Sequence, residues 1–404
     1  MNRRRFLAGL AVTLAGAASL AVSTWRPKPK PSLPLPTTST ALPATTATTT
    51  TTTVVSRTSA PPAAATDRPM PGPEPFPAAN YPPRTTDTLT GTQTTQYRPH
   101  VSDRILDLTG AVWNNAPSGG LLYPIVVDDA GAGTPDGTRT ILKNARVNGT
   151  LDLNGIRGTQ YVRYNSGVEQ NSNNAAGWII TDGVRVSKMM DAYRLRGHGT
   201  GYIKRLYASD IADDAFEIEE LNGDVYIYDT LIDGCCVGIS DRDGAALRSD
   251  NKLEIDGLLM WIKPWTDVKN SSGTFEGCSG AGPGSGCEEL TISGKFGFTP
   301  WKGHKDSRST VIVRNSWFRI DRMSCYGTSS MAWPGAGLTW GSGTPAPVYE
   351  NVKALWTGLD LSGNPTDTPY PGPALPSGVE LVSGPAALAM WDRAAAAWKA
   401  AHGY

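Results

Sequence analysis

Three aspartates in two short segments have the residue type and spacing that acid–base chemistry requires. Asp191 lies in Met190-Asp191-Ala192-Tyr193, and the other two lie in Ala212-Asp213-Asp214-Ala215. Carboxylates held close together raise one another's pKa, which supplies an acid and a base at neutral pH. Aspartate is also common at the turns of β-rich chains, where it binds the local backbone. The chemistry therefore depends on whether the fold brings the two segments together.

The elements that must position these aspartates are short strands. Between residues 105 and 326, β-rich runs such as Val184–Val186, Ile203–Leu206 and Val225–Ile227 alternate with Gly, Asn and Asp turns. The runs recur about every 20 residues, which is the length of one solenoid coil. This pattern predicts an all-β fold, a right-handed parallel β-helix (solenoid) with long loops, with a β-sandwich or propeller as the alternative. Because stacked coils lie about 4.8 Å apart, Asp191 should lie directly beneath the Asp213–Asp214 corner.

The two aspartate motifs resemble the Asn-Thr-Asp and Asp-Asp motifs of the polygalacturonase family of glycoside hydrolases, within the pectin lyase-like β-helix superfamily. The resemblance implies hydrolysis with inversion, in which Asp191 and Asp213 activate water and Asp214 is the acid. Where that family has a Gly-His-Gly motif, this chain has Gly234-Cys235-Cys236-Val237-Gly238, and its own His-Gly pair, at His198, precedes the Asp-Asp pair. The resemblance thus supports the broader superfamily of polysaccharide enzymes.

Further polar residues could contact an acidic polysaccharide. Cations suit the carboxylates of uronate sugars, because guanidinium groups bind carboxylates in a bidentate manner. The candidate substrate-binding residues are His198, Glu217, Lys302, His304, Lys305 and Arg319. A polysaccharide lyase would use the same cations to neutralise the uronate and to remove its C5 proton. An ordinary solvated face is the alternative for the basic cluster and for Glu217, and a non-catalytic glycan-binding or surface-spike β-helix is the alternative for the whole protein.

The ends of the chain differ in composition from the repetitive middle. Residues 1–23 begin with Met1-Asn2-Arg3-Arg4-Arg5-Phe6-Leu7 and continue as an apolar run, which predicts a twin-arginine-type signal peptide, or else an uncleaved membrane anchor. Residues 24–95 are rich in Thr, Pro, Ala and Ser, which predicts a disordered linker. The β-helix is expected over 96–344, and 345–404 should form a Pro/Gly-rich tail and a helix that caps the solenoid. We therefore expect a secreted or cell-surface protein.

Charge and cysteine content narrow the partners. The 37 Lys and Arg residues balance the 37 Asp and Glu residues, so a nucleic-acid partner is not expected, and membrane contact is expected only through an uncleaved signal.

Cys278 and Cys287 bracket a Gly/Ser-rich loop, which predicts a disulfide between them. A zinc site is the alternative, but the spacing typical of metal ligands is absent. No metal or cofactor is expected: Ca²⁺ would suit Asp241-Arg242-Asp243, but no calcium-binding motif surrounds it.

Overall fold

The structure, a computed structural model, describes residues 68–76, 85–101, 103–115, 123–128, 139–150, 166–172, 175–221, 223–241, 251–263, 299–303, 310–321, 333–334, 337–338, 346–359, 363–370 and 374–404. All of them belong to one compact unit, Ser59–Tyr404. The predicted signal peptide, the Cys278–Cys287 pair, His304 and Lys305 lie outside the described residues.

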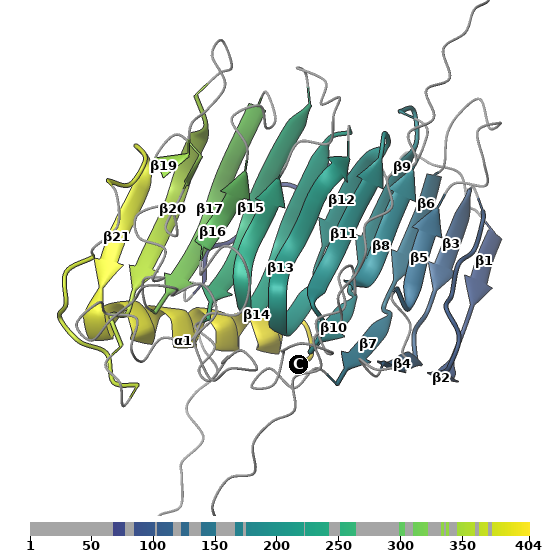
Figure 1. Cartoon of the computed structure of the whole chain (residues 1–404), viewed down its shortest axis with the longest axis horizontal. Coiled ribbons are helices and arrows are strands. Elements are labelled where there is room, and N and C mark those ends of the chain that lie inside the picture. The colour runs from purple at the N-terminus through teal and green to yellow at the C-terminus, as the bar shows by residue number, and fades with distance from the viewer. Residues whose placement is uncertain are drawn as a thin grey trace, which may run out of the picture. The chain divides into compact units, whose positions relative to one another are not determined.

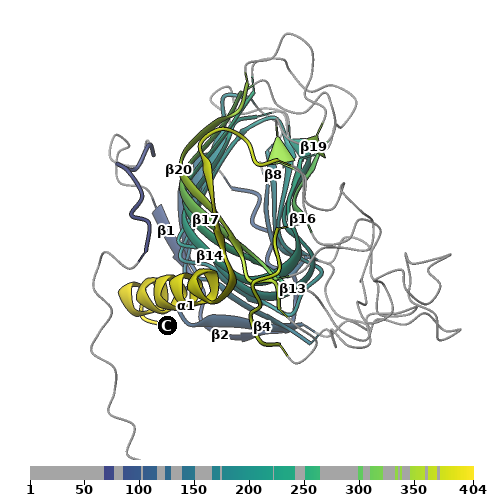
Figure 2. The same ribbon diagram turned by 90° about the vertical axis from the view of Figure 1, so that its left-hand side faces the viewer.

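Parallel strands stack in three columns that wrap around a common interior (Figures 1 and 2). Column A contains β1 (Thr85–Thr88), β3 (Arg104–Asp107), β6 (Arg139–Lys143), β9 (Trp178–Asp182), β12 (Thr200–Lys204) and the first parts of β14 (Val225–Asp241), β15 (Lys252–Ile262), β17 (Thr310–Ile320) and β20 (Val348–Trp356). Column B contains β2 (Gly91–Gln93), β4 (Ala111–Asn115), β7 (Arg146–Gly149), β10 (Arg185–Ser187), the first part of β13 (Tyr207–Leu221), later parts of β14, β15, β17 and β20, and β21 (Val379–Ser383). Column C contains β5 (Ile125–Asp128), β8 (Ser166–Ser172), β11 (Asp191–Gly197), the end of β13, the end of β14 and β16 (Thr299–Gly303). A separate pair joins β18 (Trp333–Pro334) to β19 (Gly337–Leu338).

The predicted all-β parallel β-helix is confirmed, and its stability comes from stacking like residues through the interior. In a strand, successive side chains point to opposite faces, so each strand gives one set to the interior and one to the outside. In column C the inward set is in register from strand to strand and fully buried: Ile125, Val168, Tyr193, Phe216, Ile239 and Trp301. A single coil could not bury its own apolar surface, so each coil is covered by the coils stacked on either side of it.

The corner between columns A and B is built from one residue per coil in the left-handed backbone conformation. The series has positive φ throughout: Gly110, Asn144, Gly183, Arg205, Asp229, Gly257, Asn315 and Asn351. Glycine and asparagine tolerate this conformation best, and stacked asparagines also bond to one another. Asn351 Nδ2 donates to Asn315 Oδ1 at 2.9 Å.

The described structure begins earlier than the sequence predicts. Strands β1 and β2 lie within the predicted disordered linker, as does the ordered segment 68–76. That segment crosses the outside of column A: Arg68 Nη1 binds Asp229 Oδ1 at 2.6 Å, and Phe76 packs edge-on against Tyr202 and Tyr228. Its four prolines already restrict the chain to extended conformations, so ordering it costs less entropy than composition alone suggests. The prediction of disorder over 24–95 is therefore wrong for these residues.

One helix, α1 (Gly384–Ala401), follows the last strand and lies along the side of the β-helix (Figure 1). Pro385 stands in its first turn, where the missing N–H has no cost. Its buried stripe, which includes Trp391 and Trp398, packs on residues of column B that point outward: Leu231, Leu259, Trp317 and Leu355. The sequence analysis predicted that this helix caps an open end of the solenoid, and that predicted position is wrong. The helix lies along the flank because the outward-facing apolar residues of column B, which it covers, are there.

Candidate functional site

A charged file runs along the outer face of column C. Glu169, Arg194 and Glu217 are in register on β8, β11 and β13. Their neighbours Tyr193 and Phe216 point into the interior, so these charged side chains point away from it. They are nevertheless buried, and Arg194 Nη1 binds Glu217 Oε2 at 2.6 Å. A buried ion pair keeps its charges only when the geometry is this close.

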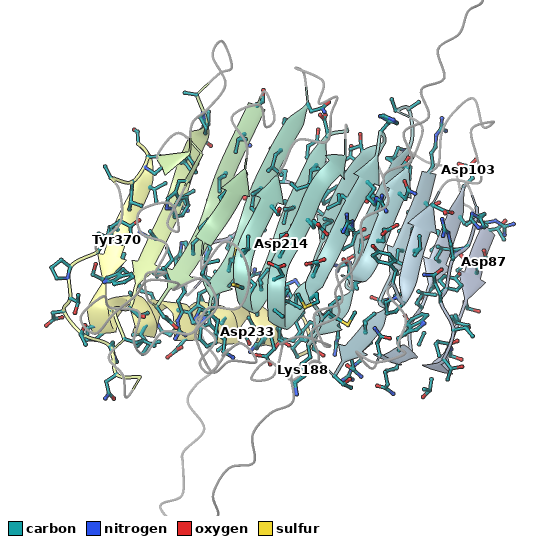
Figure 3. The ribbon with its side chains drawn as sticks, viewed as in Figure 1. Asp87, Asp103, Lys188, Asp214, Asp233 and Tyr370 are labelled. Atoms are coloured by element: carbon teal, nitrogen blue, oxygen red, sulfur yellow. The ribbon has the colours of Figure 1, made fainter. Side chains whose placement is uncertain are left out.

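Asp191 lies beside Asp214, as the sequence repeat predicts. The register of β11 on β13 aligns the two segments, and the Asp214 backbone N–H donates to Asp191 Oδ1 at 3.3 Å. Ser166 Oγ on the preceding coil donates to Asp191 Oδ2 at 3.0 Å. Asp191 is 5% exposed and Asp214 is 2% exposed, whereas Asp213 is partly exposed. The three aspartates therefore form one cluster, with Asp213 nearest to solvent (Asp214 is labelled in Figure 3).

The environment of Asp191 favours its protonated form. Burial raises its pKa well above the ordinary value, and the negative charges of Glu217, Asp214 and Asp213 raise it further. A hydrogen bond between the Asp191 and Glu217 side chains adds to the shift. Two carboxyl groups can share such a bond only if one holds a proton, and Arg194 stabilises the ionised form of Glu217. The shared proton is thus directed to Asp191.

A second ion pair and a tyrosine extend the cluster toward the N-terminal coils. Arg196 Nη1 lies 3.8 Å from Glu169 Oε1. Burial raises the pKa of Tyr123, and its hydroxyl also experiences the charges of Arg194, Glu169 and Arg196. The site therefore combines a carboxyl group whose pKa is raised, further carboxyl groups and two guanidinium groups within one face of the fold.

The other predicted substrate-binding residues are distributed differently. Glu217 belongs to the cluster, through Arg194 and Asp191. Lys302 follows Ser240 and Glu217 in the same register file, so its backbone lies two strands from the cluster. His198 is exposed in the turn beyond β11, at the opposite end of that strand from Asp191.

Arg319 is not part of this face. It lies on column B beside α1, where Nε binds Asp321 Oδ1 at 2.7 Å and the guanidinium stacks 4.0 Å from the Trp261 ring. The sequence grouped it with Lys302 because basic residues are dense in this part of the chain, but the strands that carry the two residues belong to different columns.

Sequence reasoning missed Arg194, Glu169 and Ser166. The signal was present in the repeat that aligned the aspartates: Asp191-Ala192-Tyr193-Arg194 matches Asp214-Ala215-Phe216-Glu217, and Ser166-Gly167-Val168-Glu169 precedes them by one coil. The fourth position of each segment is charged and alternates in sign from Arg194 to Glu217. In register on adjacent strands, opposite charges stabilise each other.

Among the residues that the structure describes, no group of three or more His, Cys, Asp or Glu side chains is arranged to hold a metal ion. Within the same residues, no helix has the length and apolar character needed to cross a membrane. Fold and site together define a parallel β-helix protein with a buried acidic cluster on one outer face. Comparisons with protein-family models, with curated proteins and with solved structures found no match to this chain.

Proposed function

We propose that the protein is an exported β-helix glycoside hydrolase that cleaves an acidic, uronate-containing polysaccharide at the Asp191–Asp213–Asp214 cluster. One observation carries the proposal: a buried carboxyl with a raised pKa, Asp191, lies in hydrogen-bond contact with its neighbours, beside a more exposed carboxylate, Asp213. Glycoside hydrolysis requires this combination of one protonated and one ionised carboxyl group. The likeness of the two aspartate motifs to those of polygalacturonases agrees with it.

The proposal assigns the proton to Asp191 rather than to Asp214, where the motif resemblance puts it. As the glycosidic C–O bond breaks, Asp191 transfers its proton to the leaving oxygen. Asp213 takes a proton from water, whose oxygen bonds to the anomeric carbon. Asp214 holds Asp191 in place through its backbone N–H and, by its charge, keeps the Asp191 pKa high. Exchange of protons with water then restores both groups.

The experiment compares the whole chain with two matched variants on a panel of uronate and neutral polysaccharides. Asp191→Asn removes the proton donor while preserving shape, and Asp87→Asn is the control, since Asp87 lies on the first coil far along the β-helix (Figure 3). Reducing ends and the ultraviolet absorbance of unsaturated uronates are followed together. We expect reducing ends without absorbance, and a loss of about 10²–10⁴-fold in rate for Asp191→Asn only.

Three outcomes would contradict the proposal. Rising absorbance would identify a lyase on the same fold. An unchanged rate in Asp191→Asn would remove this carboxyl from the chemistry. No product from any acidic polymer would favour the non-catalytic glycan-binding or surface-spike alternative.

A further inference from the structure

A groove lies on the outer face of column B, away from the acidic cluster on column C. Three adjoining cavities of about 350, 340 and 410 Å³ form it. Arg185 lines all three, and Arg146 lines two of them. The groove reaches from the β3–β4 turn to the C-terminal end of α1, which lies next to β10 (Figure 1).

The groove begins where α1 ends, and one register file shows why. Along column B this file contains Trp317, Leu259 and Leu231, all buried under α1. Toward the N-terminal coils it continues as Tyr207, which packs against Trp398 at the end of α1, and then as Arg185 and Arg146 beyond the helix. The change from apolar to cationic residues coincides with the end of the helix, so this part of the face is built to stay open.

Two arginines in the groove face each other without a counter-ion. Arg146 and Arg185 are direct register partners on β7 and β10, and like charges in this relation destabilise a sheet. Arg146 Nε donates to Asn148 Oδ1 at 3.1 Å, and Arg185 lies 3.9 Å from the centre of the Tyr404 ring. Within the described part of the chain, neither forms an ion pair.

The other cations of the groove are already neutralised. Arg205 binds both carboxylate oxygens of Asp182, and Lys399 Nζ binds Asp233 Oδ2 at 2.6 Å. The uncompensated charge is therefore confined to the Arg146–Arg185 pair. An anion bound between these two guanidinium groups would accept hydrogen bonds from both and relieve their repulsion.

Neutral polar and aromatic groups surround the pair. A second outward file lines the groove with Asn148, Ser187 and Ser209, in register on three adjacent strands. Tyr207 and Tyr404 form one wall, with ring centres 4.7 Å apart. Hydroxyl and amide groups in rows, aromatic rings and a paired cation are the combination that binds a chain carrying both hydroxyl groups and negative charge.

We propose that this groove is a binding site for an acidic glycan, which places its carboxylate or sulfate group between Arg146 and Arg185 and its hydroxyl groups against the Asn148–Ser187–Ser209 row. The groove runs across four coils, about 14 Å, so it accommodates a short oligosaccharide segment along the β-helix axis. The site holds substrate or cell-surface polymer and takes no part in bond cleavage.

The test measures equilibrium binding of labelled oligosaccharides by fluorescence anisotropy. All proteins carry Asp191→Asn, so that the oligomer stays intact and the result does not depend on hydrolysis. The groove variant adds Arg146→Gln and Arg185→Gln, and the control adds Arg104→Gln, an arginine paired with Asp87 on column A. The probes are an oligouronate, a sulfated oligosaccharide, a neutral oligosaccharide of equal length and inorganic polyphosphate.

We expect the groove variant to raise the Kd for an acidic oligosaccharide at least about tenfold, and the control to leave it unchanged. Added salt should weaken the binding. The uronate and sulfate arms show which acidic group the site accepts. Equal binding by all three proteins, equal binding of the neutral oligosaccharide, or binding of polyphosphate as tight as that of the sugars would each overturn the proposal.

Discussion

Replacing Asp191 by asparagine should change how the stability of the protein depends on pH. In the unfolded chain an aspartate loses its proton near pH 4, whereas burial and neighbouring carboxylates raise the pKa of folded Asp191 well above that. Over the interval between the two values the folded state holds one more proton than the unfolded state. The stability that this proton contributes is fully present below about pH 4, and it is lost as pH rises through the folded pKa.

The slope follows from linkage. Because the folded state holds one extra proton, the free energy of unfolding falls by about 1.4 kcal/mol for each unit by which the pH rises across that interval. Asparagine is neutral at every pH, so the variant lacks this slope; any hydrogen bond lost from Ser166 or from the Asp214 N–H changes its stability by an amount that does not depend on this titration. The difference between the wild type and Asp191→Asn should therefore shift in favour of the variant as pH rises from about 4.

The assay is urea unfolding of both proteins over a series of pH values, followed by tryptophan fluorescence and circular dichroism. Taking the difference between the proteins cancels the contribution of every group that titrates alike in both. Coincident transitions by the two probes are required before a free energy is extracted. If the two pH profiles run parallel, Asp191 is ionised in the folded protein and cannot be the acid.

Two further predictions concern packing around the same face and its neighbour. Arg194→Met should lower the free energy of unfolding by about 3–5 kcal/mol in urea titrations, because it leaves Glu217 as a buried carboxylate without its cation; an unchanged midpoint would show that the pair is not buried in solution. Trp391→Ala should cost about 3–5 kcal/mol of helix docking and speed hydrogen exchange in 384–401 while exchange in β11 and β13 stays slow; uniform acceleration would mean that helix and solenoid unfold together.

The repeat in the sequence predicted the β-helix and the meeting of Asp191 with Asp214. It succeeded because stacking like residues is the physical basis of the fold, so a match in sequence is also a match in space. The corner residues carry the same information: Asn144, Gly183 and Asp229 each mark where a coil turns from column A to column B. Their residue types are those that accept the left-handed conformation, and a search for them would have located the coil boundaries.

The sequence failed where an interaction joins segments without a repeat. Composition describes 68–76 as a linker, and nothing local indicates that Arg68 meets Asp229 or that Phe76 meets Tyr202. The position of α1 was missed for the same reason: its apolar stripe indicates burial but does not identify the surface that it covers. The partner surface exists only after the outward residues of β14, β15 and β17 have stacked into a file.

These two segments meet at one residue, which links the ends of the described structure. Asp229, at the corner of the sixth coil, binds Arg68 through Oδ1 and His402 through Oδ2 at 3.0 Å, and it accepts a bond from Trp398 Nε1. These partners lower its pKa, so the carboxylate stays ionised although it is largely buried. The same contacts hold the end of α1 against column B, where Tyr404 forms a wall of the basic groove. The shape of the groove therefore depends on the contacts that Asp229 makes with both ends of the described chain. Removing the Asp229 carboxylate should weaken ligand binding at Arg185 and leave the acidic cluster on column C unchanged.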